Sequence, residues 1–561
     1  MAAGGVAPER RAESPGAAAI HVDQVGWLPG RPKVALVVGL DGATGFRIRR
    51  TSDQAVVFEG ALGPPVDDAD SGDRVRAADF SALVAPGEYR VEVGDRRSWP
   101  FRVADDVYER VLQLTMRAYY GQRCGTAVDL APWFPGYRHG VCHRAGGWHV
   151  SSGRTGPRAS VKGWHDAGDY GRYVVNSNLS TGTLLWAVEL FPRTTKRLAL
   201  AIPESRDAVP DVLDEIRWNL DWMASMQDAD GGLWHKQTSE RFPPFVMPED
   251  DTLPSLVIGT GRPPYTSTCA TAGFAAVAAI AARVYRPHDP AYALRMLAAA
   301  RRAWAWAERH PDVAFANPPG VSTGEYGDTD CRDERLWASA ELWRTTGEAR
   351  YRDGALALAA ALPAALGETS PPWWRNVAAM GLWAYALGGA RDETAEAIRR
   401  RSLQIAAAVA ERTARHPYRT SLVRANYVWG SNSVAANYAL QLLVADRLSP
   451  DDRFVDMALE NLHYLLGRNP FSLSWVTGVG ANAVRRPHHR PSAADTQPDP
   501  WPGLLAGGPN QRRQDSAMQR LPDLPPARMY LDDRDSYATN EIAINWNAPL
   551  VFLLAGVVDR R

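Results

Sequence analysis

Residues 163–170 read Gly163-Trp164-His165-Asp166-Ala167-Gly168-Asp169-Tyr170. Two carboxylates lie three positions apart, with only alanine and glycine between them. Glycine frees the backbone to turn, so both carboxylates can point into one small space. Paired carboxylates suit the activation of a water molecule for hydrolysis. The same spacing also caps helices and lines solvated turns, so this stretch alone leaves catalysis and structure as open alternatives.

The first hundred residues have the pattern of a small β-sandwich. Between residues 19 and 104, seven short β-like segments are separated by glycine, proline and aspartate, which is typical of sandwich strands. They are residues 20–25, 33–38, 46–49, 55–58, 76–80, 89–93 and 99–103.

The remainder of the chain has a helical pattern. Long segments rich in alanine and leucine recur with helical periodicity, and we expect no strands between them. They are residues 107–120, 181–191, 209–227, 271–285, 291–309, 333–345, 373–387, 393–413, 433–447, 453–466 and 542–558. No fixed repeat is visible, so these helices must be layered around a common core.

Composition excludes several classes of partner. The 561 residues include 63 basic and 63 acidic side chains, so there is no basic surface for nucleic acid. No apolar run reaches the length of a membrane span, and residues 1–15 lack the apolar core of a signal peptide. The chain as written is expected to be a cytoplasmic monomer, or a secreted one if its start is trimmed or misassigned.

Two further motifs lie near the C-terminus. Residues 486–490 read Arg-Pro-His-His-Arg inside a long loop. They fit a solvated loop or an anion site, and also a sugar site, because imidazole and guanidinium groups hydrogen-bond hydroxyls. Residues 540–541 read Asn-Glu before the last apolar segment. Taken alone, Glu541 is a first-turn glutamate stabilised by the helix dipole.

In this order, the three motifs resemble glycoside hydrolase family 9, the inverting β-1,4-glucanases. Residues 465–470, Leu-Leu-Gly-Arg-Asn-Pro, also match that family. Residues 24–29, Gln-Val-Gly-Trp-Leu-Pro, and residues 86–89, Pro-Gly-Glu-Tyr, resemble the immunoglobulin-like module that precedes the catalytic domain in one branch of it.

The resemblance covers about residues 19–558 and implies a multidomain fold. Residues 19–104 would form an N-terminal immunoglobulin-like β-sandwich. Residues 105–561 would form a mainly α catalytic domain, an (α/α)6 barrel.

The resemblance also gives roles to three carboxylates. Asp169 matches the general base that activates water, and Asp166 matches a helper that holds the same water and tunes Asp169 by like-charge proximity. Glu541 matches the general acid that protonates the leaving glycosidic oxygen. Such a division agrees with the chemistry, because an inverting enzyme needs one carboxylate on each side of the sugar ring with room for water.

Four further residues match substrate-binding positions of the family. His488 and Arg490 match residues that grip the sugar near the point of cleavage, and Trp429 matches a stacking aromatic. Trp546 stands where many relatives carry tyrosine, and Asn545 where many carry aspartate. These two departures leave the details of substrate contact open.

A second group of residues suggests a metal. Cys124, Cys142, His143 and His165 are the ligand set of a closed structural zinc site. Their spacing is looser than in a zinc finger, so buried or free cysteines remain the alternative on spacing alone. The pattern resembles the one that binds zinc in the family branch with the immunoglobulin-like module. Cys269 and Cys331 have no such neighbours and are expected to be core thiols.

Residues 323–334 are dense in oxygen ligands, which suits calcium. The candidate ligands are Asp330, Asp333 and Glu334. The alternative is helix capping, because Asp333 and Glu334 lie where a helix begins. We expect no organic cofactor.

The sequence therefore predicts an endo-β-1,4-glucanase that acts on a β-glucan or cello-oligosaccharide of the cellulose or mixed-linkage type. The first alternative is an exo-acting β-glucosidase or exo-β-glucosaminidase on short oligosaccharides. A non-catalytic carbohydrate-binding protein is a third possibility, but it would tolerate the loss of one carboxylate, and all three are present.

Overall fold

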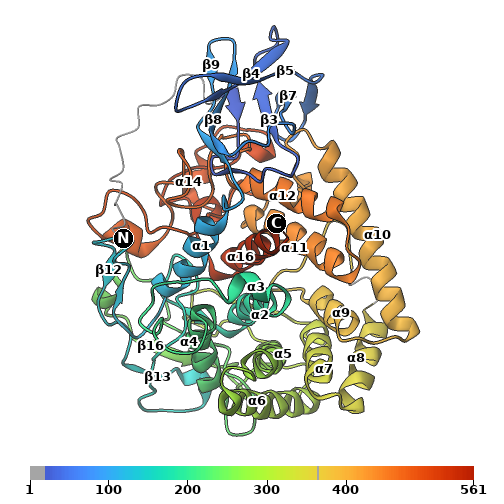
Figure 1. Ribbon diagram of the computed structural model, residues 1–561. Coiled ribbons are helices and arrows are strands. Elements are labelled where there is room, and N and C mark those ends of the chain that lie inside the picture. Colours follow the sequence, from blue (N-terminus) through green and yellow to red (C-terminus); the bar gives the residue numbers. More distant parts are fainter. Residues whose placement is uncertain (1–18, 363–365, 561) are drawn as a thin grey trace.

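The structure, a computed structural model, describes residues 19–362 and 366–560, and consists of a β-sandwich set on one end of a larger helical part (Figure 1). The last strand of the sandwich ends at Val103, and the first helix begins at Glu109.

The N-terminal part is built from two β-sheets. One sheet has the strand order β1-β3-β7-β6, and the other has β2-β10-β8-β4-β5, with β9 paired to β8. These strands are β1 Ile20–His21, β2 Gly26–Trp27, β3 Val34–Val38, β4 Gly45–Arg50, β5 Val56–Ala61, β6 Val66–Asp68, β7 Asp73–Asp79, β8 Gly87–Val93, β9 Arg96–Arg97 and β10 Phe101–Val103. Trp27, Phe80 and Phe101 pack edge to face or tilted in the space between the sheets. The immunoglobulin-like sandwich is thus confirmed. Of the predicted segment 20–25, however, only Ile20–His21 form a strand, and β2, β6 and β9 were missed.

Within the described residues, twelve long helices make up the body of the second part. They are α1 Glu109–Gly121, α2 Val174–Leu190, α4 Asp211–Ser225, α5 Thr268–Tyr285, α6 Pro290–Arg309, α7 Arg332–Thr346, α8 Ala349–Ala361, α9 Ala378–Leu387, α10 Glu393–Arg415, α11 Ser431–Leu448, α12 Asp452–Leu465 and α16 Ile544–Asp559.

Six of these helices form a closed inner ring. Each contacts the next in the order α2, α5, α7, α9, α11, α16 and back to α2. They are buried on nearly every side, as α5 and α16 illustrate, whereas outer helices such as α6 and α10 bury one face only. Figure 1 shows α6, α8 and α10 on the outside of this ring. The (α/α)6 barrel is confirmed.

The expectation that no apolar run reaches the length of a membrane span needs correction. Helix α5 is long and apolar enough, by length and composition, to cross a membrane, but 94% of it is buried inside the protein. It is one of the six inner helices of the barrel.

The expectation of no strands among the helices was wrong. Four short strands join as β13-β16-β15-β14, with bounds β13 Gly146–Trp148, β14 Arg172–Tyr173, β15 Lys236–Thr238 and β16 Ser255–Ile258. A separate pair joins β11 Val128–Asp129 to β12 Arg138–His139. Strands of two to four residues are too short to show a period in sequence. Helix α8 was also missed.

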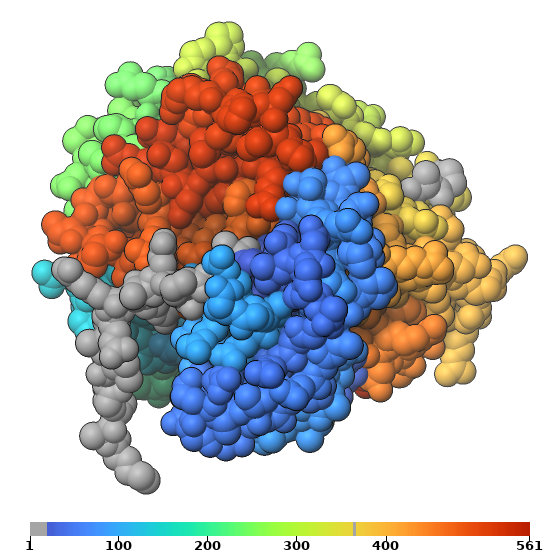
Figure 2. Space-filling model, turned by 90° about the horizontal axis from the view of Figure 1, so that it is seen from above, coloured from blue at the N-terminus to red at the C-terminus, as the bar shows by residue number. Residues whose placement is uncertain are grey.

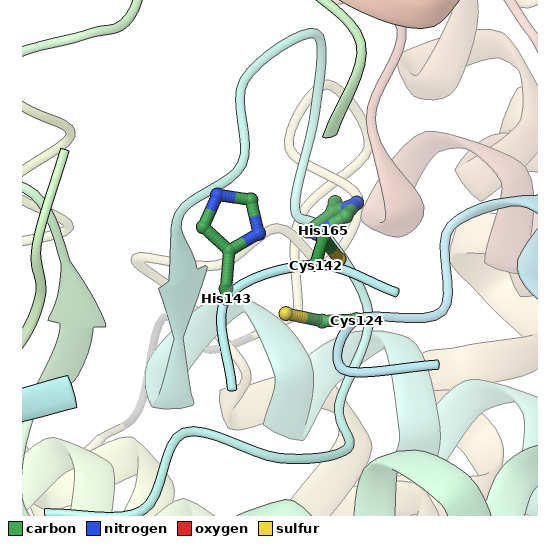
Figure 3. A group of neighbouring side chains, drawn as sticks. All are labelled: Cys124, Cys142, His143 and His165. Atoms are coloured by element: carbon green, nitrogen blue, oxygen red, sulfur yellow. The ribbon is translucent and has the colours of Figure 1, made fainter. Parts of the chain in front are cut away.

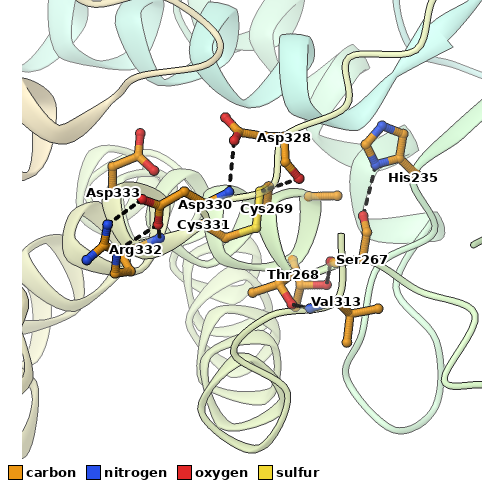
Figure 4. The surroundings of a disulfide bond; sticks show 12 residues. His235, Ser267, Thr268, Cys269, Val313, Asp328, Asp330, Cys331, Arg332 and Asp333 are labelled. Atoms are coloured by element: carbon orange, nitrogen blue, oxygen red, sulfur yellow. Dashed lines mark hydrogen bonds and ion pairs between the residues drawn. A yellow bond between two sulfur atoms is a disulfide. The ribbon is translucent and has the colours of Figure 1, made fainter. Parts of the chain in front are cut away.

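The two remaining cysteines correct a further expectation. Cys269 in α5 and Cys331 just before α7 form a disulfide across a separation of 62 residues, so they are not core thiols (Figure 4). Pairing depends on proximity in space, which the sequence did not reveal.

The sandwich lies against the C-terminal third of the chain (Figure 2). His463 in α12 bonds Asp23 at 2.8 Å in a fully buried contact, and the ring of Trp27 packs 5.4 Å from His463. Arg528 pairs with Asp73 at 2.7 Å. The interface is therefore polar at specific points and fixes the orientation of the sandwich.

Candidate active site

Asp166 and Asp169 lie in a tight turn just before β14. The turn is closed by the amide of Asp166, which donates to the carbonyl of Gly171 at 2.9 Å. Oδ1 of Asp166 accepts from Nδ2 of Asn176 at 2.6 Å, and Oδ2 accepts from the hydroxyl of Tyr326 at 2.7 Å. Both oxygens of this buried carboxylate are thereby fixed in direction.

Asp169 is held in a similar way. Its Oδ2 accepts from the hydroxyl of Tyr173 and from the amide of Gly171, each at 3.0 Å. The second oxygen, Oδ1, takes no part in these bonds and is the one available for a water molecule.

Glu541 lies beside this pair but outside the last helix. It follows the short helix α15 (Tyr537–Asn540) in an extended conformation, with φ −66° and ψ 159°, and α16 begins three residues later. The alternative of a first-turn glutamate on the last helix is therefore wrong. Glu541 instead belongs to a connecting segment that the neighbouring loops hold on both sides.

Backbone contacts join the three motifs directly. Glu541 forms a β-bridge with His488, and Ala543 forms one with Ala167. The amide of Ile544 donates to the carbonyl of Asp166 at 2.8 Å. Residues that are 375 positions apart in sequence (541 − 166) thus share one site.

Burial and neighbouring charges raise the pKa values of two of these carboxylates, Asp166 and Glu541. Burial, and then the charge of Asp169, raise the pKa of Asp166 to about 8. Burial, followed by the charges of Asp169 and Asp166, raises the pKa of Glu541 well above its ordinary value. This environment favours the protonated form of Glu541.

The His-His-Arg loop packs against the turn that carries the two aspartates. The carbonyl of Gly168 accepts from the amide of Arg490 at 3.2 Å and from its Nη1 at 2.7 Å. Arg490 also donates from Nε to the carbonyl of Pro243 and is only 5% exposed. These hydrogen bonds hold the loop in place, so Arg490 is less free to bind the sugar than its predicted role requires. His488, which donates from Nδ1 to the carbonyl of Arg534 at 2.5 Å, is half-buried beside Glu541.

Exposed aromatic rings continue from His488. Tyr537 lies 6.0 Å from His488, and Trp429 lies 5.4 Å from Tyr537, between ring centroids. Trp429 is 39% exposed, as a stacking residue requires. Trp546 differs, because it is only 8% exposed and packs beneath Gly430. The prediction that Trp546 offers a face to substrate needs correction: it supports the backbone next to Trp429.

Sequence reasoning missed the partners of the carboxylates. Asn176, Tyr173 and Tyr326 donate to Asp166 and Asp169, and Trp374 packs 5.1 Å from Tyr326 with the exposed Trp373 beside it. Tyr326 lies within residues 323–334, which had been considered only for calcium. The one local signal was the pair of nearby glycines, because Gly327 directly follows Tyr326 and Gly324 lies two residues before it.

The four predicted zinc ligands come together (Figure 3). One ligand atom from each of Cys124, Cys142, His143 and His165 lies within 4.8 Å of the others. Nε2 of His143 donates to Oδ2 of Asp251 at 3.0 Å, while its buried Nδ1 has no hydrogen-bond partner among the described residues. A carboxylate behind a ligating histidine is typical of metal sites, so this donor set fits a tetrahedral metal.

The predicted calcium ligands come together only in part (Figure 4). Asp330 turns toward the surface and pairs with Arg332 at 2.6 Å, so its inclusion was wrong. Asp333 and Glu334 are buried close to Asp328, whose charge contributes to raising the pKa of both, after burial. Within the described residues, neither oxygen of Glu334 has a hydrogen-bond partner. Asp328 was not among the predicted ligands.

An (α/α)6 barrel with buried, unequally tuned carboxylates at one end is the arrangement of a glycoside hydrolase. The chain belongs to glycosyl hydrolase family 9, whose family model matches residues 108–554. Residues 16–98 match the cellulase N-terminal immunoglobulin-like domain.

Relatives extend over nearly the whole chain. Endoglucanase D of Acetivibrio thermocellus is 35% identical over 96% of this chain and 83% of its own length. A cellodextrinase of Butyrivibrio fibrisolvens is 32% identical over 96% of this chain and all of its own length. Among solved structures, a zinc-binding triple mutant of the family 9 endoglucanase J30 is 37% identical, with a TM-score of 0.88 over 95% of this chain and 100% of that one.

Proposed function

We propose that this protein is an endo-β-1,4-glucanase that hydrolyses soluble β-glucans with inversion of configuration. The observation that carries the proposal is the meeting of Asp166, Asp169 and Glu541 in one site, where the pKa of Glu541 is raised while Asp169 accepts two hydrogen bonds. These environments suit an acid and a base respectively.

Asp169 is the general base. Hydrogen bonds to a carboxylate favour its charged form, and those from Tyr173 and Gly171 occupy only Oδ2. Oδ1 then takes a proton from a water molecule as that water attacks the anomeric carbon. Asp166, held by Asn176 and Tyr326, orients the same water.

Glu541 is the general acid. Its proton passes to the glycosidic oxygen as the bond to the anomeric carbon breaks, so the leaving sugar departs as a neutral alcohol. Burial and the negative charge of Asp169 favour the protonated form of Glu541 until that step. His488 and the exposed ring of Trp429 hold the sugar alongside it.

Action at internal bonds is supported by the endoglucanase relative, and the cellodextrinase relative favours the second candidate, an enzyme of short oligosaccharides. A product profile on cellopentaose and carboxymethylcellulose separates the two. Random internal cuts with a rapid fall in viscosity are expected of the endoglucanase, while stepwise loss of terminal units would support the alternative. Proton NMR of the first product should show the α-anomer, and the β-anomer would refute inversion.

Zinc is the metal we propose for Cys124, Cys142, His143 and His165. Two thiolates and two imidazoles fill a tetrahedral zinc shell and leave no position for a catalytic water. The metal would fix residues 124–143 to His165, next to Asp166. Its role is thus structural.

A cation, with calcium as the best fit, is proposed for Asp328, Asp333 and Glu334. Carboxylate oxygens are its preferred ligands, and three neighbouring buried carboxylates without a cation repel one another. Titration of metal-free protein with calcium should raise its melting temperature, and an unchanged melting temperature would refute the site.

A further inference from the structure

Tyr326, which donates to Asp166, has a strained backbone. Its φ is +45°, a conformation that a bulky residue adopts only where the surrounding structure enforces it. The hydroxyl nevertheless reaches Oδ2 of Asp166 at 2.7 Å. Something in the fold must therefore hold residues 323–326 in place.

Two consecutive side chains at the start of β15 supply that hold. Nζ of Lys236 donates to the carbonyl of Gly324 at 2.8 Å and to Oγ1 of Thr323 at 3.1 Å. Nε2 of His235 donates to the carbonyl of Glu325 at 2.9 Å. The residues immediately before Tyr326 are thus tied to the β-sheet of the barrel.

The same loop contacts the second carboxylate. The amide of Gly324 donates to the hydroxyl of Tyr173 at 3.1 Å, and that hydroxyl donates to Oδ2 of Asp169 at 3.0 Å. Residues 323–326 therefore supply the hydrogen bond from Tyr326 to Asp166. They also orient the hydroxyl of Tyr173 that donates to Asp169. A shift of this loop would disturb both members of the pair.

We propose that Lys236 is a positioning residue for catalysis: it anchors residues 323–326 and places a buried positive charge near Asp169. The inference rests on the proposed function, in which Asp169 is the base. Lys236 itself touches neither the substrate nor the reacting atoms.

The choice of lysine supports this role. Only four of the 63 basic residues in the chain are lysines, so arginine is the usual cation here. An ammonium group is a compact point charge with three donors, and Lys236 directs its donors to Asn317, Thr323 and Gly324. A planar guanidinium would not fit the same three acceptors.

The charge of Lys236 acts on Asp169 in a defined direction. The charged groups facing Lys236 are Asp169 and Glu325, and those facing Asp169 also include Asp166 and Glu541. Burial lowers the pKa of Lys236 to about 7, although the charges of Asp169 and Glu325 oppose this shift. Lys236 is therefore charged at acidic pH. A nearby positive charge favours the ionised form of a carboxylate, so removal of the Lys236 charge should move the acidic limb of the pH–rate profile to higher pH.

The test compares Lys236→Met with Lys33→Met. Lys33 is also a buried lysine, bonded to the carbonyls of Pro29 and Arg31 in the sandwich, and serves as the matched control. Lys236→Met should lower kcat on a soluble β-glucan by ~10-fold or more and move the acidic limb of the kcat profile up by ~0.5–1 pH unit. KM should change little. Lys33→Met should change neither kcat nor the limb.

Two more variants complete the test. Lys236→Arg keeps the charge, so its acidic limb should stay at the wild-type position although its kcat falls. Lys236→Gln lacks the charge and should show the shifted limb, which keeps the test usable if Lys236→Met fails to fold. The proposal would be overturned if the acidic limb of the kcat profile stayed at the wild-type pH in Lys236→Met and Lys236→Gln. An equal shift of that limb in Lys33→Met would also overturn it.

A measurement without substrate separates this inference from the proposed function. Amide hydrogen exchange over residues 323–326 should be faster in Lys236→Met than in wild-type protein or Lys33→Met. Unchanged exchange would refute the anchor even if the enzyme is an inverting glucanase. Faster exchange in a protein that forms the β-anomer would support the anchor while the proposed mechanism fails.

Discussion

Gly168 lies directly against the carbonyl group of His488: a Cβ atom on Gly168 would be 2.0 Å from the carbonyl oxygen. No real Cβ approaches a backbone atom so closely, so the turn of the aspartate pair and the His-His-Arg loop fit together only because residue 168 is glycine. This contact sets the spacing between Asp169 and Glu541, since Glu541 is bridged to His488.

Gly168→Ala should therefore push the two loops apart and lower kcat on β-glucan by ~10²-fold or more, because small displacements of reacting groups are costly. The control is Gly42→Ala in the sandwich, where an added Cβ meets nothing within 4 Å. Steady-state kinetics of both variants decide the matter. Wild-type kcat in Gly168→Ala would mean that the site tolerates a wider gap.

Asp169→Asn and Glu541→Gln should each reduce the rate on natural glucan by ~10²–10⁴-fold, the range expected for general acid–base catalysis. Glu541→Gln should recover part of its activity on a dinitrophenyl glycoside, whose leaving group needs no proton, and Asp169→Asn should not. Near wild-type cleavage of glucan by either variant contradicts the assignment of roles.

Asp166→Asn should stabilise the protein most at alkaline pH. The folded pKa of Asp166 is raised to about 8 from 3.8, so folding is favoured by this group below the unfolded value and loses that contribution as pH rises through about 8. Asparagine does not titrate. The melting temperature of the variant relative to wild type should rise between about pH 5 and about pH 9. Asp95→Asn, whose carboxylate is 90% exposed, should give no such trend.

Removal of metal should affect stability before chemistry. Elemental analysis should find about one zinc per chain, and chelation should lower the melting temperature because the metal holds a loop rather than the substrate. Cys124→Ser should lose the zinc, whereas Cys331→Ser should keep it. A protein free of zinc, or a disulfide between Cys124 and Cys142, would contradict the site.

Loss of the disulfide should destabilise the fold. The disulfide joins residues 62 positions apart. Because it lowers the conformational entropy of the unfolded chain, it should raise the free energy of unfolding by up to about 4 kcal/mol. Cys331→Ser should therefore unfold at lower urea concentration than oxidised wild-type protein, and a reducing agent should shift only the wild type. Equal midpoints would show that the bond does not form in solution.

The sequence predicted the architecture well because long helices and sandwich strands carry their periodicity locally. The (α/α)6 barrel and the meeting of Cys124, Cys142, His143 and His165 were inferred from motifs and were found in the structure. Assignment of the family followed from the order of the motifs rather than from any one of them.

What could not be predicted depends on contacts between distant segments. Tyr326 meets Asp166 across 160 residues, and the Cys269–Cys331 bond depends on how α5 and α7 approach each other. Trp546 was placed by analogy, but the burial of its ring follows from the close approach of Gly430. Asp330 was wrongly predicted as a calcium ligand, because the sequence did not show that its carboxylate pairs with Arg332 at the surface.

The bridge from Ala543 to Ala167 and the bond from Ile544 to Asp166 have a consequence for biosynthesis. A ribosome makes the chain from its N-terminus, and domains fold as they emerge. A nascent chain that stops short of residue 541 already contains eleven of the twelve long helices, yet it has neither the acid nor the segment against which the aspartate turn is seated. If Glu541 is the acid that we propose, we expect the growing polypeptide to lack hydrolytic activity until residues 541–544 have been made, so a chain terminated before them would be nearly complete but inactive.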